Sequence, residues 1–191
     1  MKLQATTLPG VLSVEPTAFA DERGWFMESF NEARWQAALR ELGQPVPRRF
    51  VQDNHSCSKA GVLRGLHYQL PPHAQGKLVR VVQGAAFDVA VDIRRGSPHF
   101  GQWAGVELSA ANRRQLWIPE GFAHGFMALE DDTHFLYKTT DVYARECERS
   151  IRWDDPAIGI AWALPASMAA PLVAPKDASA PPLAQAELPP L

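Results

Sequence analysis

Two neighbouring stretches, Gly61-Val-Leu-Arg-Gly-Leu-His-Tyr-Gln69 and Gln75-Gly-Lys-Leu-Val-Arg-Val-Val82, decide the fold of this chain. Both have the composition of β-strands, with Gly65 and Gly76 as the expected bends, yet both carry basic side chains. Such residues can be edge charges that keep a sheet soluble, with a half-buried and satisfied histidine. They can also line a ligand site, and the rest of the chain decides between these interpretations.

Length and composition limit the class of protein. A chain of 191 residues forms one domain of ordinary size. Its 19 Lys and Arg nearly balance its 21 Asp and Glu, which indicates neither a nucleic-acid partner nor a membrane partner. No apolar run is long enough to cross a bilayer, and the first residues lack the apolar core of a secretory signal. We therefore expect a cytoplasmic protein in which Cys57 and Cys147 are free thiols.

Strand signals dominate from Phe50 onward and predict an all-β fold. The clearest strand is 85–94, where an apolar face alternates with a face that carries Asp88 and Asp92. Turn signals recur about every ten residues, as in a sandwich or barrel. Further short strands are expected at Leu8–Pro16, Trp25–Phe30, Gln102–Leu108, Arg114–Ile118, Gly125–Leu129, His134–Thr139 and Ser150–Trp153.

One helix and one change of composition complete the outline. Asn31 can cap a helix that Gly43 ends, with Trp35, Leu39 and Leu42 on its apolar stripe. Residues 1–162 are expected to form a single domain. Residues 163–191 are rich in proline and alanine, so they form no central strand and no long helix. They are either a disordered tail or a segment that packs on the same domain.

Hydrogen-bond donors and titratable groups recur on separate strands, which solvent-exposed faces seldom show. A barrel of this size either fills its interior or leaves a cavity for one small ligand. This set favours a ligand cavity: Arg23, Gln52, Asn54, Arg64, His67, Lys77, His124 and Tyr137.

Parts of the two metal-binding motifs of cupins are present. Gly61 and His67 match the start of the first motif, and 119–124 matches the middle of the second. A metal cupin would carry histidine at position 69 and asparagine at position 128, where this chain has Gln69 and Ala128. The glutamate expected near position 73 is missing as well. Because a catalytic zinc or iron site needs about three protein ligands, we expect no metal.

Many stretches resemble the dTDP-4-dehydrorhamnose 3,5-epimerase family, in collinear order from Leu8 to about Trp162. Besides the two stretches quoted first, they are Asp21-Glu-Arg-Gly24, Gln52-Asp-Asn-His-Ser56, Phe87-Asp-Val-Ala-Val-Asp-Ile-Arg94, Gln115-Leu-Trp-Ile-Pro-Glu-Gly-Phe-Ala-His-Gly-Phe126, Leu136-Tyr-Lys-Thr-Thr140 and Trp153-Asp-Asp-Pro156. The resemblance implies a metal-free, cupin-type jelly-roll β-barrel that forms a homodimer and uses no cofactor. It also implies inversion of C3 and C5 of dTDP-4-dehydro-6-deoxyglucose, which gives dTDP-4-dehydro-L-rhamnose on the route to dTDP-rhamnose.

The resemblance also implies roles for the catalytic residues. His67 would be the base, Lys77 would face the C4 oxygen, and Tyr137 would return a proton to the opposite face of the sugar. A carboxylate should fix the tautomer of His67. Asp177 occupies the family's position for it, although Ala174 and Pro175 precede it where a Leu-Ser pair is usual, and Asp88 is the alternative.

Binding residues follow from the same resemblance. Arg23 and Arg64 would bind the diphosphate, and the strands before the barrel would carry Arg23 and Glu28 towards a partner's site. The others are Gln52 and Asn54 near the nucleotide, Tyr143 or Phe26 against thymine, and His124 near the sugar, whereas His55, His73, His99 and His134 are expected at the surface. An epimerase that inverts only C3 or only C5 has the same residues. A non-catalytic cupin that binds sugar nucleotides is the alternative from another class.

Overall fold

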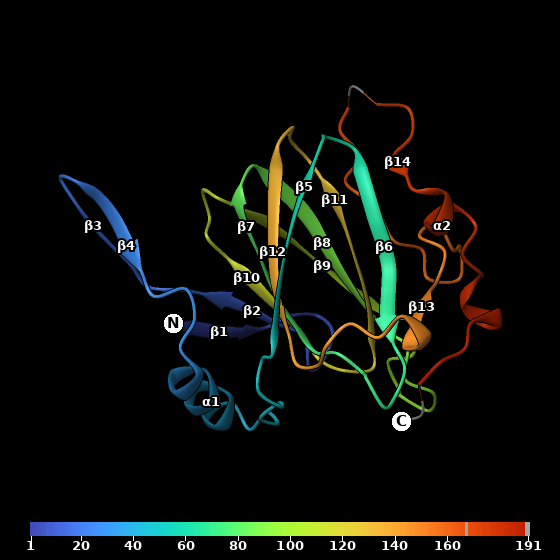
Figure 1. The fold of residues 1–191 in the computed structure, drawn as a ribbon, viewed down its shortest axis with the longest axis horizontal. Coiled ribbons are helices and arrows are strands. Elements are labelled where there is room, and N and C mark those ends of the chain that lie inside the picture. The colour runs from blue at the N-terminus through green and yellow to red at the C-terminus, as the bar shows by residue number, and fades with distance from the viewer. Residues whose placement is uncertain (167, 190–191) are drawn as a thin grey trace.

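The computed structural model describes residues 1–166 and 168–189, and most of them lie in or beside two facing antiparallel sheets (Figure 1). Within those residues, the first sheet has the strand order β1 (Lys2–Ala5), β2 (Leu12–Glu15), β10 (Gln115–Ile118), β7 (Lys77–Gln83), β12 (Thr133–Thr139) and β5 (Gln52–Ser58). The second has the order β13 (Glu148–Ser150), β6 (Val62–Gln69), β11 (Phe122–Ala128), β8 (Ala85–Asp92) and β9 (Trp103–Ser109).

The main core lies between these sheets. Val79 and Phe135 from the first sheet pack with Ala90 and Phe126 from the second. The rings of Phe126 and Phe135 stack with centroids 4.0 Å apart and planes 3° apart. Alternate residues of each strand point into the space between the sheets. The strands that contribute apolar residues to this core therefore also place other, polar side chains in the same space.

A second core forms on the outer face of the second sheet, under the C-terminal segment. Leu183 and Ala186 of that segment are buried with Val89, Val91 and Ile93. The Oδ2 atom of Asp155 accepts a hydrogen bond of 2.6 Å from the Leu183 amide. These residues of the proline- and alanine-rich segment therefore pack on the second sheet.

Two helices flank the sheets in the described residues. Helix α1 (Glu32–Glu41) begins where predicted, because Asn31 Oδ1 accepts from the Arg34 amide. Trp35 and Leu39 of its predicted apolar stripe are buried, whereas Leu42 is exposed. The one-turn helix α2 (Pro175–Ala178) lies in the C-terminal segment, where no helix was predicted.

Most of the expected elements are present, but several differ from the prediction. The strands do not close into the expected barrel: in the described residues they form two separate sheets, with a small two-stranded sheet beside them. Of the strand predicted at 150–153, only Ser150 lies in a strand, because β13 runs from Glu148 to Ser150. Strand β1 was not predicted, because it is short and, among the described strands, pairs only with β2.

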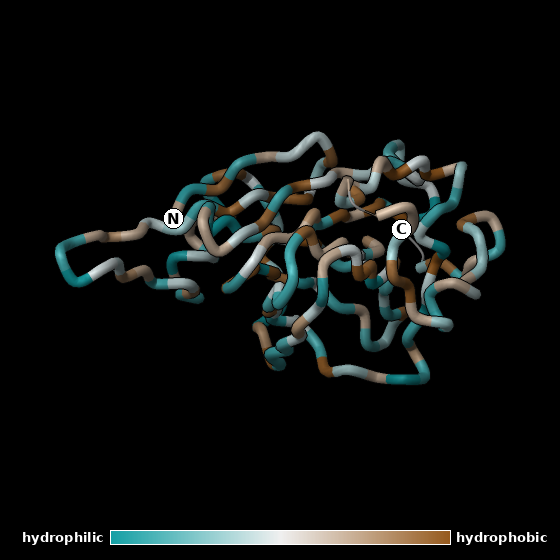
Figure 2. The backbone as a smooth tube through the Cα atoms, turned by 90° about the horizontal axis from the view of Figure 1, so that it is seen from above, coloured by the Kyte–Doolittle hydropathy of each residue, from teal (hydrophilic) through white to brown (hydrophobic). Residues whose placement is uncertain are grey.

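The small sheet is a hairpin of β3 (Ala18–Asp21) and β4 (Gly24–Met27), which projects from the body (Figures 1 and 2). Its large apolar side chains are exposed, with 66 % of Phe19, 53 % of Trp25 and 71 % of Phe26 accessible. Such side chains gain nothing from folding unless another surface covers them. None of the described helices is long and apolar enough to span a membrane.

Candidate active site

A cavity of about 400 Å³ lies between the two sheets and collects many of the predicted site residues. A smaller space of about 130 Å³ adjoins it and shares Asn54, His67, Lys77 and Tyr137. The larger cavity is lined by Asn54, His55, Ser56, Arg64, His67, Lys77, His124, Phe126, Tyr137, Ala174, Lys176 and Asp177.

His67 on β6 contacts a carboxylate from the C-terminal segment. Its Nε2 lies 2.6 Å from Asp177 Oδ1, and the two side chains are 29 % and 5 % exposed. Burial alone would raise the pKa of Asp177, but His67, the Gly65 amide and the charge of Lys176 together outweigh it and hold that pKa below its usual value. An imidazole held through Nε2 keeps Nδ1 as the nitrogen that can exchange a proton in the cavity.

The Gly65 amide gives Asp177 its second hydrogen bond, at a point where Gly65 and Gly125 lie close together. A Cβ on Gly65 would lie only 2.5 Å from Gly125 Cα, and Gly65 has a φ of +136°. The ladder between β6 and β11 shifts register there, between His124 and Phe126. The amide of Gly65 donates to Asp177 Oδ2 at 3.1 Å, so both oxygens of this carboxylate are held.

Asp88, the alternative partner expected for His67, contacts His124 instead. His124 and His67 are neighbours across β11 and β6, and His124 Nε2 lies 2.6 Å from Asp88 Oδ1. Both residues are buried, and burial lowers the pKa of His124 although the Asp88 carboxylate opposes that shift. Of the two candidate carboxylates, Asp177 contacts His67 and Asp88 contacts His124, because β8 brings Asp88 beside β11.

Lys77 begins β7 and is only 8 % exposed. Its Nζ donates to the carbonyl oxygen of His67 at 3.4 Å. Burial lowers the pKa of Lys77 to about 8, although the charges of Asp88 and Glu148 raise it in part. A buried ammonium beside a histidine is suited to stabilise a developing negative charge.

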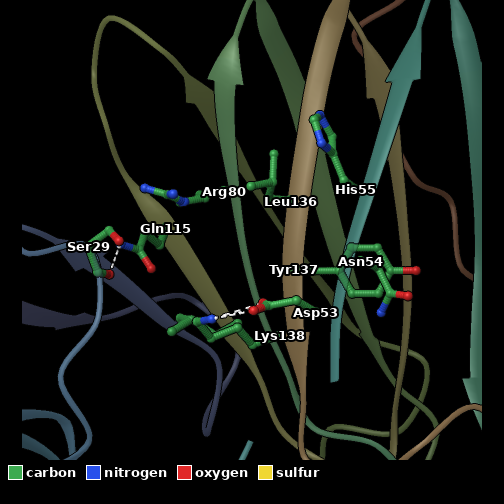
Figure 3. Close-up of a pocket in the computed structure, with 10 residues that line it drawn as sticks. Ser29, Asp53, Asn54, His55, Arg80, Gln115, Leu136, Tyr137 and Lys138 are labelled. Carbon is green, nitrogen blue, oxygen red and sulfur yellow. Dashed lines mark hydrogen bonds and ion pairs between the residues drawn. The ribbon is translucent and has the colours of Figure 1, made fainter. Parts of the chain in front are cut away.

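Tyr137 lies on β12, in the sheet opposite His67, and lines both spaces. Burial raises the pKa of its phenol, with Arg64 acting in the other direction. The phenol therefore keeps its proton at neutral pH and can donate it. Tyr137 pairs with Asn54 in the ladder, and both point to the opposite side of the sheet from Arg80 and Lys138 (Figure 3).

The predicted binding residues on the body of the protein line the two spaces. Arg64 donates to Ser58 Oγ and to the Cys57 carbonyl, while Gln52 donates to Asn54. Tyr143 donates its phenol proton to Glu148 Oε2 at 3.0 Å, and Lys176 pairs with the same carboxylate at 2.6 Å. The prediction missed Glu148 because it belongs to the charged run 145–149, which resembles a solvated surface.

Arg23, Glu28 and Phe26 are not among the residues that line these spaces. Arg23 sits in the turn of the projecting hairpin, 85 % exposed, and pairs with Asp21 of the same turn. Glu28 pairs with Arg34 just after the hairpin. Within one chain, the structure thus separates this part of the predicted set from the rest.

A further pocket, of about 260 Å³, lies on the other face of the first sheet (Figure 3). Lys138 and Asp53 form an ion pair of 2.8 Å there, and Gln115 donates to the Ser29 carbonyl. Asn54, His55 and Tyr137 line it as well as the larger cavity, whereas His67, Lys77 and Asp177 are not among its lining residues.

The structure also bears on the predictions made for the two cysteines and for a metal site. Cys57 is exposed and Cys147 is buried, and both are free thiols, as predicted. Among residues 1–166 and 168–189, no three His, Cys, Asp or Glu side chains are grouped so that they could hold a metal ion. The Gln69 amide, at the position of a missing ligand, instead bonds to backbone groups of His73, Val142 and Ala144.

Comparison with known proteins shows what this chain is similar to. The family model of dTDP-4-dehydrorhamnose 3,5-epimerase matches residues 5–185. A protein of that name from Salmonella typhimurium is 57 % identical over 183 residues, which cover 96 % of each chain. A Legionella pneumophila epimerase, solved with dTDP-4-keto-L-rhamnose, is 48 % identical with a TM-score of 0.91, covering 100 % of this chain and 98 % of its own. A 3'-monoepimerase from Streptomyces bikiniensis, solved with dTDP-quinovose, is 35 % identical with a TM-score of 0.85, covering 100 % of this chain and 93 % of its own.

Proposed function

This chain belongs to the dTDP-4-dehydrorhamnose 3,5-epimerase family, and we propose that it inverts C3 and C5 of dTDP-4-dehydro-6-deoxyglucose to give dTDP-4-dehydro-L-rhamnose. One observation carries this proposal. A histidine held by a buried carboxylate, a buried lysine and a phenol with a raised pKa meet at one cavity. Proton transfer next to a ketone needs a base, a stabiliser of the enolate and an acid, and these residues can supply all three.

His67 is the proposed base. The C4 ketone makes the protons on C3 and C5 acidic, and His67 removes one of them through Nδ1. Asp177 holds the ring through Nε2 and stabilises the imidazolium that forms, as the carboxylate of a hydrolase triad does. The contact is short and Asp177 is buried, so water competes little for it.

Lys77 is the proposed partner of the C4 oxygen. As the proton leaves carbon, negative charge develops on this oxygen, and a cation already in place lowers the energy of the enolate. One such preorganised donor typically contributes about 3–4 kcal/mol, far more than an exposed charge does. With a pKa of about 8, Lys77 still carries its charge on most molecules at neutral pH.

Tyr137 is the proposed acid. It belongs to the first sheet and His67 to the second, so a sugar between the sheets would have one residue on each side. Removal of a proton by His67 and delivery by Tyr137 then inverts the carbon. The raised pKa keeps the phenol protonated until the enolate accepts its proton.

The other lining residues are proposed to hold the nucleotide. Arg64 binds the diphosphate, Gln52 and Asn54 contact the nucleotide, His124 contacts the sugar, and Tyr143 stacks on thymine. Arg23 in the hairpin and Glu28 just after it do not line their own cavity and are proposed to act at the site of a partner subunit. The exposed aromatic residues of the hairpin support a homodimer in which a second copy covers them.

We further propose that the sheets form a jelly roll. With β1 and β2 set aside, the strand orders are β10-β7-β12-β5 and β13-β6-β11-β8-β9, so successive strands from β5 to β12 alternate between the sheets except at β8–β9. Residues 1–162 are proposed as its single domain, and 163–191 as a segment that packs on it and delivers Asp177.

Incubation with dTDP-4-dehydro-6-deoxyglucose in deuterated water tests this function. Deuterium at both C3 and C5, with both centres inverted, is expected. Inversion at one carbon alone would mean a monoepimerase, which is the activity named for the Streptomyces bikiniensis relative. Absence of exchange together with tight dTDP binding would mean a non-catalytic binding protein. In His67→Asn, exchange should fall about 10²–10⁴-fold at both carbons while dTDP binding stays nearly unchanged.

A further inference from the structure

Three glutamine side chains hold four consecutive residues beside the cavity. The segment 141–144 lies between β12 and β13 and has neither helix nor strand geometry. Its backbone bonds to the glutamines in an unbroken series. Gln75 Nε2 donates to the Asp141 carbonyl at 2.8 Å, Gln69 Nε2 donates to the Val142 carbonyl at 3.1 Å, Gln52 Oε1 accepts from the Tyr143 amide at 2.9 Å, and Gln69 Oε1 accepts from the Ala144 amide at 2.8 Å.

Hydrogen bonds, rather than packing, hold the centre of this segment. Val142 is 47 % exposed and Tyr143 is 53 % exposed, so neither side chain anchors the chain by burial. A loop with exposed side chains and no ladder of its own is mobile unless other groups satisfy its backbone. Gln69 is only 6 % exposed and reaches the segment from the last position of β6.

Only an amide side chain can make the contacts that Gln69 makes. Its Nε2 also donates to the His73 carbonyl at 2.6 Å, so this one side chain uses two donors and one acceptor on three backbone groups. A neutral imidazole has one donor and one acceptor, and a carboxylate has no donor. The residue at a metal-ligand position of other cupins therefore has a different task in this chain.

We propose that Gln69, assisted by Gln75, is a positioning residue for substrate recognition. By fixing the segment 141–144, it holds the Tyr143 ring at the edge of the smaller space, where Gln52 and Glu148 also lie. The ligand so recognised is the pyrimidine ring of a nucleoside diphosphate. This inference rests on the proposed function, because it assigns Gln69 to the stacking role proposed for Tyr143.

The test compares Gln69→Met with Gln83→Met, a matched exchange on the exposed end of β7. Gln69→Met keeps the length of the side chain and removes all three hydrogen bonds. It should raise the Kd for dTDP, measured by calorimetry, and the KM about tenfold while kcat changes less than about twofold. Amide exchange of Tyr143 and Ala144 should become faster. Gln83→Met should leave all of these values unchanged.

A double-mutant cycle with Tyr143→Ala decides the mechanism. Tyr143→Ala alone should weaken dTDP binding roughly 5- to 100-fold, the range for loss of one stacked base. If Gln69 acts through Tyr143, Gln69→Met should add almost nothing in the Tyr143→Ala background. Independent, multiplying losses would overturn the proposal, as would a fall in kcat with KM unchanged.

Two further measurements cover the cases in which Gln69→Met does not fold or the wild type is inactive. If Gln69→Met fails to fold, Gln75→Met, which removes one hydrogen bond at a half-buried position, should show a smaller rise in Kd with the same dependence on Tyr143. A Gln75→Met variant that binds dTDP like the wild type would then contradict the inference. Because dTDP binding needs no turnover, an inactive wild type would refute the proposed epimerase function and leave this measurement intact.

Discussion

Lys77 is the residue whose titration gives the clearest expected pH dependence. The proposed role requires the charged ammonium, and the group loses its proton as the pH rises through its pKa of about 8. The pH dependence of kcat/KM reports the pKa values of groups in the free enzyme. We therefore expect kcat/KM to fall above a pH of about 8. The Tyr137 phenol titrates higher, because burial raises its pKa, so the fall belongs to Lys77. In Lys77→Arg the activity should be lower but this fall should vanish, and an unchanged alkaline limb would assign it to another group.

Asp177 and Asp88 provide a matched pair of carboxylates. Each lies 2.6 Å from a histidine, and only Asp177 contacts His67. In Asp177→Asn the imidazolium loses its negative partner, so solvent exchange at C3 and C5 should slow about 10²-fold, less than in His67→Asn. Deuterium incorporation measured by NMR should fall much less in Asp88→Asn. The reverse order of the two variants would return the orienting role to Asp88.

Single residues were predictable to different degrees. The strand positions of His67, Lys77 and Tyr137 followed from local pattern, but the contact of His67 with Asp177 spans 110 positions and was expected only from the family resemblance. Alternation placed Asp88 on the polar face of its strand. It could not show which histidine this carboxylate meets, because that depends on the register between β8 and β11.

The C-terminal segment is the element on which the proposed base depends. Strand β14 (Leu172–Val173) runs parallel to β6, and α2 then places Asp177 against His67. Asp155, only 4 % exposed, anchors the segment further on, with Oδ2 on the Leu183 amide and Oδ1 on the Ala157 amide. Contacts on both sides of Asp177 in the chain thus hold it in place: β14 pairs with β6 before it, and Leu183 bonds to Asp155 after it.

Asp155→Ala should therefore weaken both folding and catalysis. The buried amide of Leu183 and the part-buried amide of Ala157 lose their acceptor, so the free energy of unfolding should fall by about 2–4 kcal/mol in urea titrations. The kcat should fall as well, because Asp177 is held less firmly. The control is Asp154→Ala, whose exposed carboxylate pairs with Arg152 and should change stability by less than about 0.5 kcal/mol. Equal effects of the two variants would contradict this role for Asp155.

Strands were predicted best where one face is apolar and the other is polar. The pattern at 85–94 predicted β8 to within two residues, because its apolar face meets the second core. Strand β1 and the one-turn α2 carry no such pattern. Their structure comes from pairing with β2 and from docking on β6, which are tertiary contacts that a local sequence pattern does not reveal.

At the scale of the whole molecule, the hairpin separates Arg23 from its own cavity. If a partner's site uses Arg23, two inactive variants should complement each other. A mixture of Arg23→Ala and His67→Asn subunits, unfolded and refolded together, contains mixed dimers with one intact site each. About one quarter of all sites should then be active in an equimolar random mixture. Activity no higher than the sum of the separate variants, or an active monomer of 21.1 kDa in light scattering, would contradict the shared site.

The central claim is that a sugar between the two sheets loses a proton to His67 on the second sheet and gains one from Tyr137 on the first. The most direct measurement is the ratio of solvent exchange to inversion in Tyr137→Phe, whose ring keeps the packing beside Phe135. With His67 and Lys77 intact, the enolate should still form and take up deuterium on the face that lost the proton. We predict nearly normal exchange with retained configuration and a far larger loss of inversion, most of all at C5. Exchange and inversion that decline together would contradict the assignment of the acid to Tyr137.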